Sequence, residues 1–140
     1  MTKIITNSDQ ETFAFGLKLG RLCRGGEVFA LCGDLGAGKT RLVQGLAQGL
    51  GIKSRVTSPT FNILKVYKAS KKIRSFYHID AYRLRSEKDL IALGIREFLS
   101  MPDSVTAIEW ADRVKKIWPQ ETRVIKIKPL SEARREIIYS

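Results

Sequence analysis

The chain has 140 residues, of which 44% are apolar, and its formal net charge is +11. This length predicts a single domain, residues 1–140, with enough apolar material for a core. No apolar run approaches the ~18 residues that would cross a bilayer, and residues 1–6 lack the apolar core of a secretory signal. We therefore expect a cytoplasmic protein with no membrane segment.

The excess of positive charge has two open explanations: attraction to a polyanion or an acidic partner, or a solvated basic surface. The densest basic clusters are Lys65, Lys68, Lys71, Lys72 and Arg74, and then Arg113, Lys115 and Lys116. The two cysteines, Cys23 and Cys32, lack metal-ligand spacing, so we expect neither a metal site nor a disulfide there.

An edge strand over residues 3–6 and a helix over residues 9–23 are the first predicted elements. Ser8-Asp9-Gln10-Glu11 has the S-x-x-E form of a capping box, in which side chains satisfy free backbone amides at a helix start. The helical spacing comes from Phe15, Leu19 and Leu22. A glycine pair at residues 25–26 ends this helix.

A glycine-rich segment then follows an apolar stretch, residues 27–32, that predicts a buried parallel strand. Its sequence, Gly33-Asp34-Leu35-Gly36-Ala37-Gly38-Lys39-Thr40, matches the phosphate-binding pattern G-x-x-x-x-G-K-T. Glycines let successive N–H groups curl around a phosphate, the lysine reaches the β- and γ-phosphates, and the threonine hydroxyl binds Mg²⁺. A helix up to Gly51 completes the required order. We expect residues 33–40 and the adjoining Arg41 to bind a nucleotide.

The segment Val56-Thr57-Ser58-Pro59-Thr60-Phe61 is predicted to be extended, because Pro59 disfavours helix for itself and for Ser58. Its hydroxyl groups are candidates for contacting the γ-phosphate and Mg²⁺, as switch segments do. An ordinary turn between helix and strand explains the same residues and stays open.

Strands over residues 62–68 and 73–79 predict a hairpin, which makes the sheet mixed rather than purely parallel. The hairpin leads into Asp80, and a further buried strand, residues 105–108, leads into Glu109. Ligands of open α/β sheets bind outside the carboxyl ends of strands. Asp80 and Glu109 are therefore candidates for binding Mg²⁺ or orienting water, although either carboxylate alone could be structural.

Short helices are expected over residues 86–93, 95–99 and 113–117, and a C-terminal hairpin over residues 123–128 and 135–139. The predicted fold class is α/β, with a mixed central sheet and flanking helices in three layers, as in P-loop NTPases.

Four motifs together resemble the TsaE family, small bacterial ATPases of the pathway that makes threonylcarbamoyl-adenosine in tRNA. In chain order they are residues 33–40, Ser58-Pro59-Thr60-Phe61, His78-Ile79-Asp80-Ala81-Tyr82-Arg83-Leu84 and Ile108-Glu109-Trp110. The resemblance extends over most of the chain, and four ordered motifs are more specific than the phosphate loop alone. Ala111 stands where many members have proline, which leaves the metal ligand unchanged.

The resemblance implies a Mg²⁺-dependent ATPase that supports the TsaB–TsaD complex, with tRNA contacted directly or through that complex. Lys39 and the loop amides would hold the ATP phosphates, and Thr40 and Glu109 would bind Mg²⁺. Asp80 would act in hydrolysis, at the metal or its water. Ser58 and Thr60 would sense the nucleotide. The adenine contacts would come from Asp9, Thr12 and Arg134.

Other functions stay as alternatives. A small-molecule kinase could use the same loop, but the stretch between Asp80 and Glu109 is short for an acceptor lid. A basic nucleic-acid-binding adaptor could use ATP as a conformational ligand. A GTPase is disfavoured because no Asn-Lys-x-Asp segment occurs, and a Ser-His-Asp hydrolase because His78, the single histidine, has no nucleophile elbow nearby.

Overall fold

The computed structural model describes residues 1–34, 36–57, 59, 62–70 and 72–140. Within them the strands are β1 (Thr2–Thr6), β2 (Val28–Cys32), β3 (Leu64–Lys68), β4 (Ser75–Asp80), β5 (Ser104–Glu109), β6 (Arg123–Pro129) and β7 (Arg135–Tyr139). The helices are α1 (Asp9–Leu22), α2 (Lys39–Gly49), α3 (Lys88–Ala92), α4 (Ile95–Phe98) and the 3₁₀ helix η1 (Ala111–Ile117). None of the helices in this part of the chain has the length and apolar character needed to span a membrane.

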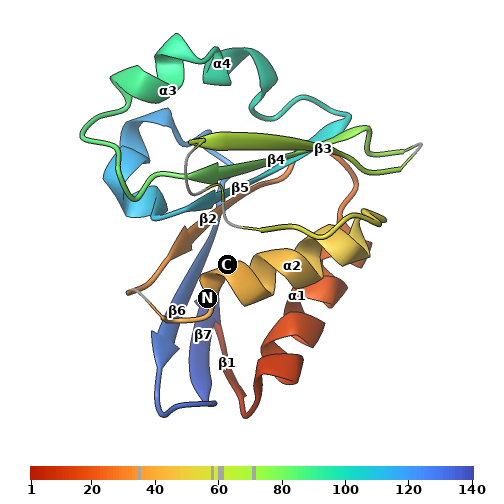
Figure 1. Ribbon diagram of the computed structural model, residues 1–140, viewed down its shortest axis with the longest axis vertical. Coiled ribbons are helices and arrows are strands. Elements are labelled where there is room, and N and C mark those ends of the chain that lie inside the picture. The colour runs from red at the N-terminus through yellow and green to blue at the C-terminus, as the bar shows by residue number, and fades with distance from the viewer. Residues whose placement is uncertain (35, 58, 60–61, 71) are drawn as a thin grey trace.

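The strands form one mixed sheet in the order β1-β7-β6-β2-β5-β4-β3 (Figure 1). Strands β6, β2, β5 and β4 are parallel, and β1, β7 and β3 pair with their neighbours in antiparallel fashion. The mixed sheet expected from the sequence is confirmed. Because parallel strands end at the same edge, β2, β4 and β5 carry the phosphate loop, Asp80 and Glu109 to one side of the sheet.

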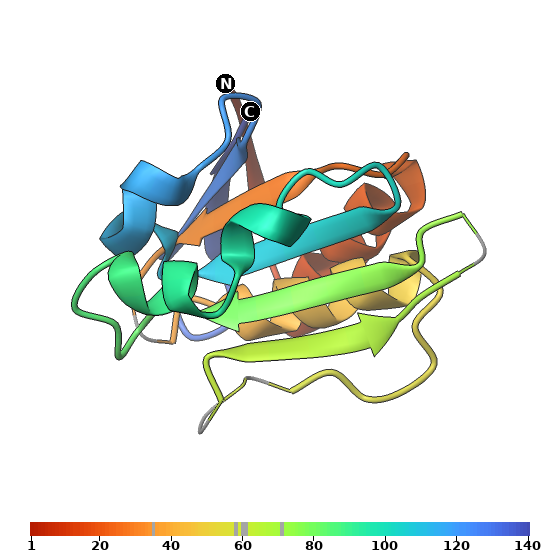
Figure 2. The same cartoon turned by 90° about the horizontal axis from the view of Figure 1, so that it is seen from above.

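Apolar cores fill both faces of the sheet. Phe29 and Leu31 of β2 pack in a cluster with α1 and α2. The alternate residues Val28 and Ala30 pack in a second cluster with α3, α4 and η1. All four side chains are buried, as the two-residue alternation of a strand requires when helices cover both faces. The result is a three-layer arrangement (Figure 2).

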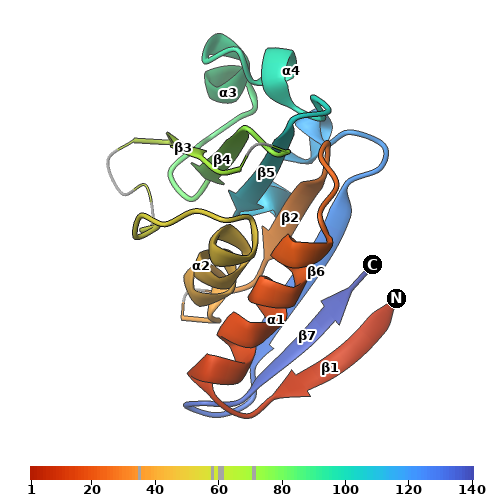
Figure 3. The same cartoon turned by 90° about the vertical axis from the view of Figure 1, so that its right-hand side faces the viewer.

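Helices α1 and α2 lie side by side with their backbones in contact (Figure 3). A Cβ at Gly16 of α1 would lie 2.1 Å from the carbonyl oxygen of Leu42, and a Cβ at Gly45 of α2 would lie 2.1 Å from that of Phe13. Gly20 and Gly49 repeat this arrangement one turn further along. Only glycine permits such an approach, so the sequence brings these helices closer together than side chains would allow.

The segment after β5 differs from the prediction. We expected a helix over residues 113–117, whereas η1 begins at Ala111 and is interrupted by a non-helical Val114. Trp110 leaves β5 with φ of +56°, a left-handed conformation that is uncommon for a residue with a side chain. This sharp turn places Ala111 directly in the core beneath the sheet, where it is fully buried.

Candidate functional site

The glycine-rich loop joins β2 to α2 at the carboxyl edge of the parallel strands. Gly38 caps α2 with φ of +99°, which favours glycine, and turns the helix N-terminus toward the loop. A Cβ at Gly33 would lie 2.5 Å from the carbonyl oxygen of Ile127, so the loop starts against β6. Ala37 is buried, and its N–H donates to the carbonyl oxygen of Asp34 at 3.0 Å. The loop is therefore compact and backed by the sheet.

Lys39, the first residue of α2, folds back over this loop. Its ammonium group donates hydrogen bonds to the carbonyl oxygens of Gly33 and Asp34, the latter at 3.0 Å. It also lies 4.0 Å from the ring centroid of Trp110. Burial lowers the pKa of Lys39, while the carboxylates of the site oppose that effect. A partly desolvated cation at the mouth of an amide-lined loop is suited to bind phosphate oxygens.

Glu109 is the last residue of β5 and is 3% exposed. Each of its two carboxylate oxygens has a polar contact within the protein. Oε1 accepts a hydrogen bond from the hydroxyl of Thr40 at 3.1 Å. Oε2 lies 2.6 Å from Nε2 of His78, which is fully buried in β4. Since an ionised carboxylate can only accept, Nε2 carries the proton and donates it to this bond. His78 therefore holds the Glu109 carboxylate in one orientation, with its other oxygen toward Thr40.

Asp80 ends β4 directly beside Glu109, which is its register partner in β5. Oδ1 of Asp80 accepts a hydrogen bond from the backbone N–H of Tyr82 at 3.0 Å, which orients the side chain through a local turn. The charges of Asp80 and Glu109 both act on Lys39. The structure thus brings the three predicted catalytic residues and the hydroxyl of Thr40 to the same edge of the sheet.

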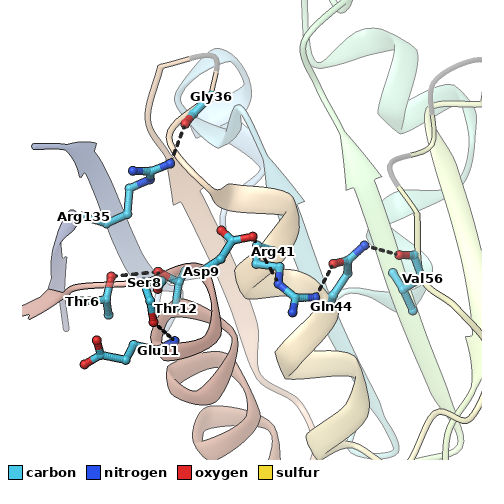
Figure 4. Close-up of polar contacts among 10 residues, drawn as sticks. All are labelled: Thr6, Ser8, Asp9, Glu11, Thr12, Gly36, Arg41, Gln44, Val56 and Arg135. Carbon is cyan, nitrogen blue, oxygen red and sulfur yellow. Dashed lines mark hydrogen bonds and ion pairs between the residues drawn. The ribbon is translucent and has the colours of Figure 1, made fainter. Parts of the chain in front are cut away.

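Two of the residues expected near the adenine, Asp9 and Thr12, lie at the start of α1 (Figure 4). Asp9 forms an ion pair with Arg41 of α2 at 3.7 Å. Thr12 is buried, and its hydroxyl lies 2.8 Å from that of a threonine in β1. Arg134 donates to Oδ1 of Asn7 at 3.1 Å and therefore lies beside the same helix start. The adenine contacts themselves stay a prediction.

Arg135, the neighbour of Arg134, contacts the phosphate loop, and the sequence analysis expected no role for it. Nη2 of Arg135 donates to the carbonyl oxygen of Gly36 at 3.4 Å (Figure 4). Nη1 donates to the carbonyl oxygens of Ser131, Glu132 and Arg134, so one guanidinium group ties the β6–β7 turn to the loop. Arg135 is the first residue of β7, whereas Arg134 precedes the strand and bonds to Asn7 instead.

Two more residues of the site had no expected role, although both lie in motifs quoted above. His78 orients Glu109, and Trp110 lies beneath the ammonium group of Lys39. The available signal for His78 was its spacing, because a residue two positions before Asp80 lies on the same side of the strand. That signal becomes useful only when β5 is known to be the neighbouring strand.

Ser58 and Thr60 of the expected sensing loop, and Leu35 of the phosphate loop, lie outside the described residues. The segment just before Ser58 is anchored to α2. Nε2 of Gln44 donates to the carbonyl oxygen of Val56 at 3.0 Å, and Oε1 of Gln44 accepts from Arg41 at 3.2 Å (Figure 4). A chain of polar contacts thus leads from the start of α1 to the start of this loop.

The oxygen atoms at the sheet edge fit a magnesium ion that arrives with a nucleotide. Mg²⁺ is usually bound by one or two protein ligands together with substrate phosphates and water. The Thr40 hydroxyl and the Glu109 carboxylate are 3.1 Å apart, so one ion could contact both oxygens. In the described portion of the chain no three His, Cys, Asp or Glu side chains converge, so a preformed cage of protein ligands is not the arrangement found there.

Comparison with known proteins gives the family. The family model "Threonylcarbamoyl adenosine biosynthesis protein TsaE" matches residues 6–137. The tRNA threonylcarbamoyladenosine biosynthesis protein TsaE of Treponema pallidum is 41% identical over 135 residues, covering 96% of this chain and 97% of the relative. The protein of the same name from Bacillus subtilis is 38% identical over 135 residues, covering 96% and 82%.

A solved structure supports the same assignment. The crystal structure of Bacillus subtilis YdiB aligns with a TM-score of 0.78 at 34% identity, covering 99% of this chain and 83% of that one. The predicted fold, a mixed sheet flanked by helices as in P-loop NTPases, is confirmed. The motifs, the fold and these similarities agree, and the chain belongs to the TsaE family of threonylcarbamoyl-adenosine biosynthesis proteins.

Proposed function

We propose that this protein is a Mg²⁺-dependent ATPase that supports the threonylcarbamoyl-adenosine modification of tRNA. The observation that carries the proposal is the placement of Lys39, Thr40, Asp80 and Glu109 around the mouth of the phosphate loop. A cation, a hydroxyl and two carboxylates at the end of parallel strands are the groups that phosphoryl transfer to water uses.

Each of these groups has a distinct part in the proposed reaction. Lys39 and the loop amides hold the phosphates of ATP and offset the negative charge that spreads over the γ-phosphoryl oxygens. Thr40 and Glu109 hold Mg²⁺, which when bound neutralises charge on the β- and γ-phosphates. Asp80 orients the attacking water with its carboxylate, which the backbone N–H of Tyr82 holds at the end of β4. Most of the catalysis is then positioning and charge neutralisation.

We further propose that hydrolysis takes place in the cytoplasm, is slow in the isolated protein, and is stimulated by the TsaB–TsaD complex. Membership of a family named for this biosynthetic pathway supports a partner from the same pathway. The contacts from Asp9 through Arg41 and Gln44 to Val56 offer a physical link between the nucleotide and the sensing loop. A partner that binds near this loop could act on the site through that link.

An ATPase assay of the purified chain, alone and with the TsaB–TsaD complex, tests the proposal. We expect Lys39→Ala to abolish tight ATP binding, and Asp80→Ala to bind ATP but lose hydrolysis. Asp112→Ala is the matched control, because this exposed carboxylate also acts on Lys39 but has no proposed role.

Normal hydrolysis by Asp80→Ala would remove the role given to Asp80. No hydrolysis by the wild type with the complex would count against the whole proposal, and phosphate transfer to a nucleoside would favour a kinase.

A further inference from the structure

Many basic side chains that the nucleotide site does not use lie on residues 51–57 and on the β3–β4 hairpin. We call this surface the basic face, and its members are Lys53, Arg55, Lys65, Lys68, Lys72 and Arg74. Five of the six are exposed, and Lys65 is half-buried. A substantial part of the net charge of +11 is therefore concentrated on two neighbouring segments.

Direct contacts join these two segments into one surface. The ammonium group of Lys65 donates to the hydroxyl of Thr57 at 3.0 Å. A Cβ at Gly51 would lie 3.7 Å from the Cβ of Ser70, in the turn between β3 and β4. Figure 2 shows residues 51–57 running beside this hairpin. Lys53, Arg55 and Lys65 thus lie on the α2 side of the sheet edge. Lys68 lies on the opposite face of β3, where it lines a second hollow together with Arg74 and Tyr77.

A groove of about 820 Å³ lies between residues 51–56 and helix α2. Its lining includes the cations of Arg41, Lys53 and Arg55, together with the neutral hydrogen-bonding groups of Gln48 and Ser54. Arg41 is paired with Asp9, so the unpaired positive charge of the groove comes from the loop. Concave basic surfaces with neutral donors favour anionic ligands.

Little negative charge offsets the basic face. Arg74 has an ion pair with Asp103 at 4.0 Å, and both side chains are well exposed. Among the residues that the structure describes, Lys53 and Arg55 take part in no ion pair. Like charges closer than the Debye length of about 8 Å repel one another. A polyanion would remove this repulsion on binding.

We propose that the basic face binds the phosphodiester backbone of an RNA. Lysine and arginine contact phosphates, while amide and hydroxyl donors reach phosphate and sugar oxygens. Cations on both faces of one sheet edge suit a polyanion long enough to follow that edge, such as a nucleic acid, better than a short acidic peptide. None of the six cations belongs to the proposed catalytic set of Lys39, Asp80 and Glu109, so this inference does not depend on ATP hydrolysis.

Fluorescence anisotropy with a labelled, unmodified tRNA transcript, measured over a range of salt concentrations, tests the inference. The wild type should bind at low salt, with an affinity that falls steeply as salt is added. The double variant Lys53→Ala/Arg55→Ala should bind about tenfold more weakly, and its log–log salt slope should decrease by about 2. The matched control Lys126→Ala/Lys128→Ala removes two exposed lysines of β6, at a distance of several strands from β3, and should change neither quantity.

The double variant should keep wild-type ATP binding and thermal unfolding, since neither residue has a place in the nucleotide site. No binding of tRNA by the wild type at low salt, or an equal loss in the control, would overturn the inference. Loss of binding to the TsaB–TsaD complex with tRNA binding intact would also overturn it, and would make the basic face a docking surface for an acidic protein. These readouts are separate from hydrolysis, so failure of the ATPase proposal would be recognised independently.

Discussion

Glu109 is oriented before any metal ion arrives, because both of its oxygens have partners in the protein. Thr40 donates to one oxygen at 3.1 Å, and His78 lies 2.6 Å from the other. An ion bound at this oxygen would replace only the Thr40 contact and would leave the His78 contact in place. We therefore expect His78, which would not touch the ion, to influence how tightly the proposed site binds it.

Replacement of His78 by alanine should weaken Mg²⁺-dependent ATP binding. The variant leaves one buried oxygen of Glu109 without a donor, and loss of such supporting contacts typically lowers metal affinity about 10- to 100-fold. A Mg²⁺ titration of ATP binding measures this directly. His78→Gln keeps an N–H donor and should recover part of the affinity. If both variants lost thermal stability while the Mg²⁺ midpoint stayed unchanged, His78 would have only a structural role.

The buried thiol of Cys23 should make the free energy of unfolding fall as the pH rises into the alkaline range. Desolvation, together with the charge of Glu27, raises the pKa of Cys23 from 9.0 to about 12. Between these values the unfolded chain binds fewer protons than the folded one, so the free energy of unfolding falls as pH rises. The slope from this one group approaches about 1.4 kcal/mol per pH unit. Urea unfolding of wild type and Cys23→Ala on either side of pH 9.0 should show a smaller alkaline decline in the variant. An equal decline in both would contradict this assignment.

At the scale of the elements, the backbone contact between α1 and α2 matters most for the site, because both helices begin there. The start of α2 carries Lys39 and Thr40, and the start of α1 carries Asp9 and Thr12. Because glycines bring the two backbones together, no layer of side chains lies between these helices to absorb a displacement. The expected adenine contacts and phosphate contacts are thus held at one fixed separation.

Replacement of Gly45 by alanine should destabilise the fold. Helix propensity alone favours alanine by about 1 kcal/mol, but the added methyl group would lie 2.1 Å from the carbonyl oxygen of Phe13. Relief requires the helices to separate, and overpacking of this kind costs about 1–3 kcal/mol. We expect a net loss of that order in the free energy of unfolding, measured with urea. Lys18→Ala, on the exposed side of α1, should stay within about 0.5 kcal/mol of wild type. A gain in stability for Gly45→Ala would contradict the close contact.

Most elements were predictable because local patterns determine them. The apolar stretch before Gly33 and the helical spacing after Thr40 place β2 and α2 within one or two residues of the observed bounds. The start of η1 was not predictable. It depends on the left-handed backbone of Trp110, which no propensity favours and which brings Ala111 into the core.

At the scale of the whole molecule, strand order decides which residues meet. The sequence places an acidic residue at the end of each of two strands, yet it contains no local signal that β4 and β5 are neighbours. His78 and Glu109 are 31 positions apart, and they pair because Asp80 and Glu109 are in register. The identity of the loop and its lysine could therefore be predicted, whereas the partner of Glu109 required the tertiary structure.

Binding of Mg-ATP should stabilise the entire fold, because the site draws on α2, β4 and β5 and is backed by β6. With the nucleotide at about 100 times its dissociation constant, the free energy of unfolding should rise by about 2.7 kcal/mol. Thermal unfolding measures this gain. Removal of Mg²⁺ with a chelator should reduce it, and Lys39→Ala should lose it. An equal gain in Lys39→Ala would show that ATP stabilises the protein from somewhere else.

The pairing of β1 with β7, which sets Thr2 opposite Tyr139, has a consequence for synthesis on the ribosome. Strand β1 emerges early, yet its partner in the sheet is made after every other strand. The central strand β2 also cannot pair until late in synthesis, since both of its neighbours, β5 and β6, belong to the second half of the chain. Gly33 rests on Ile127 of β6, so the phosphate loop lacks its backing until then. A nascent chain that stops before β6 contains the complete G-x-x-x-x-G-K-T motif but lacks the strand against which the phosphate loop packs.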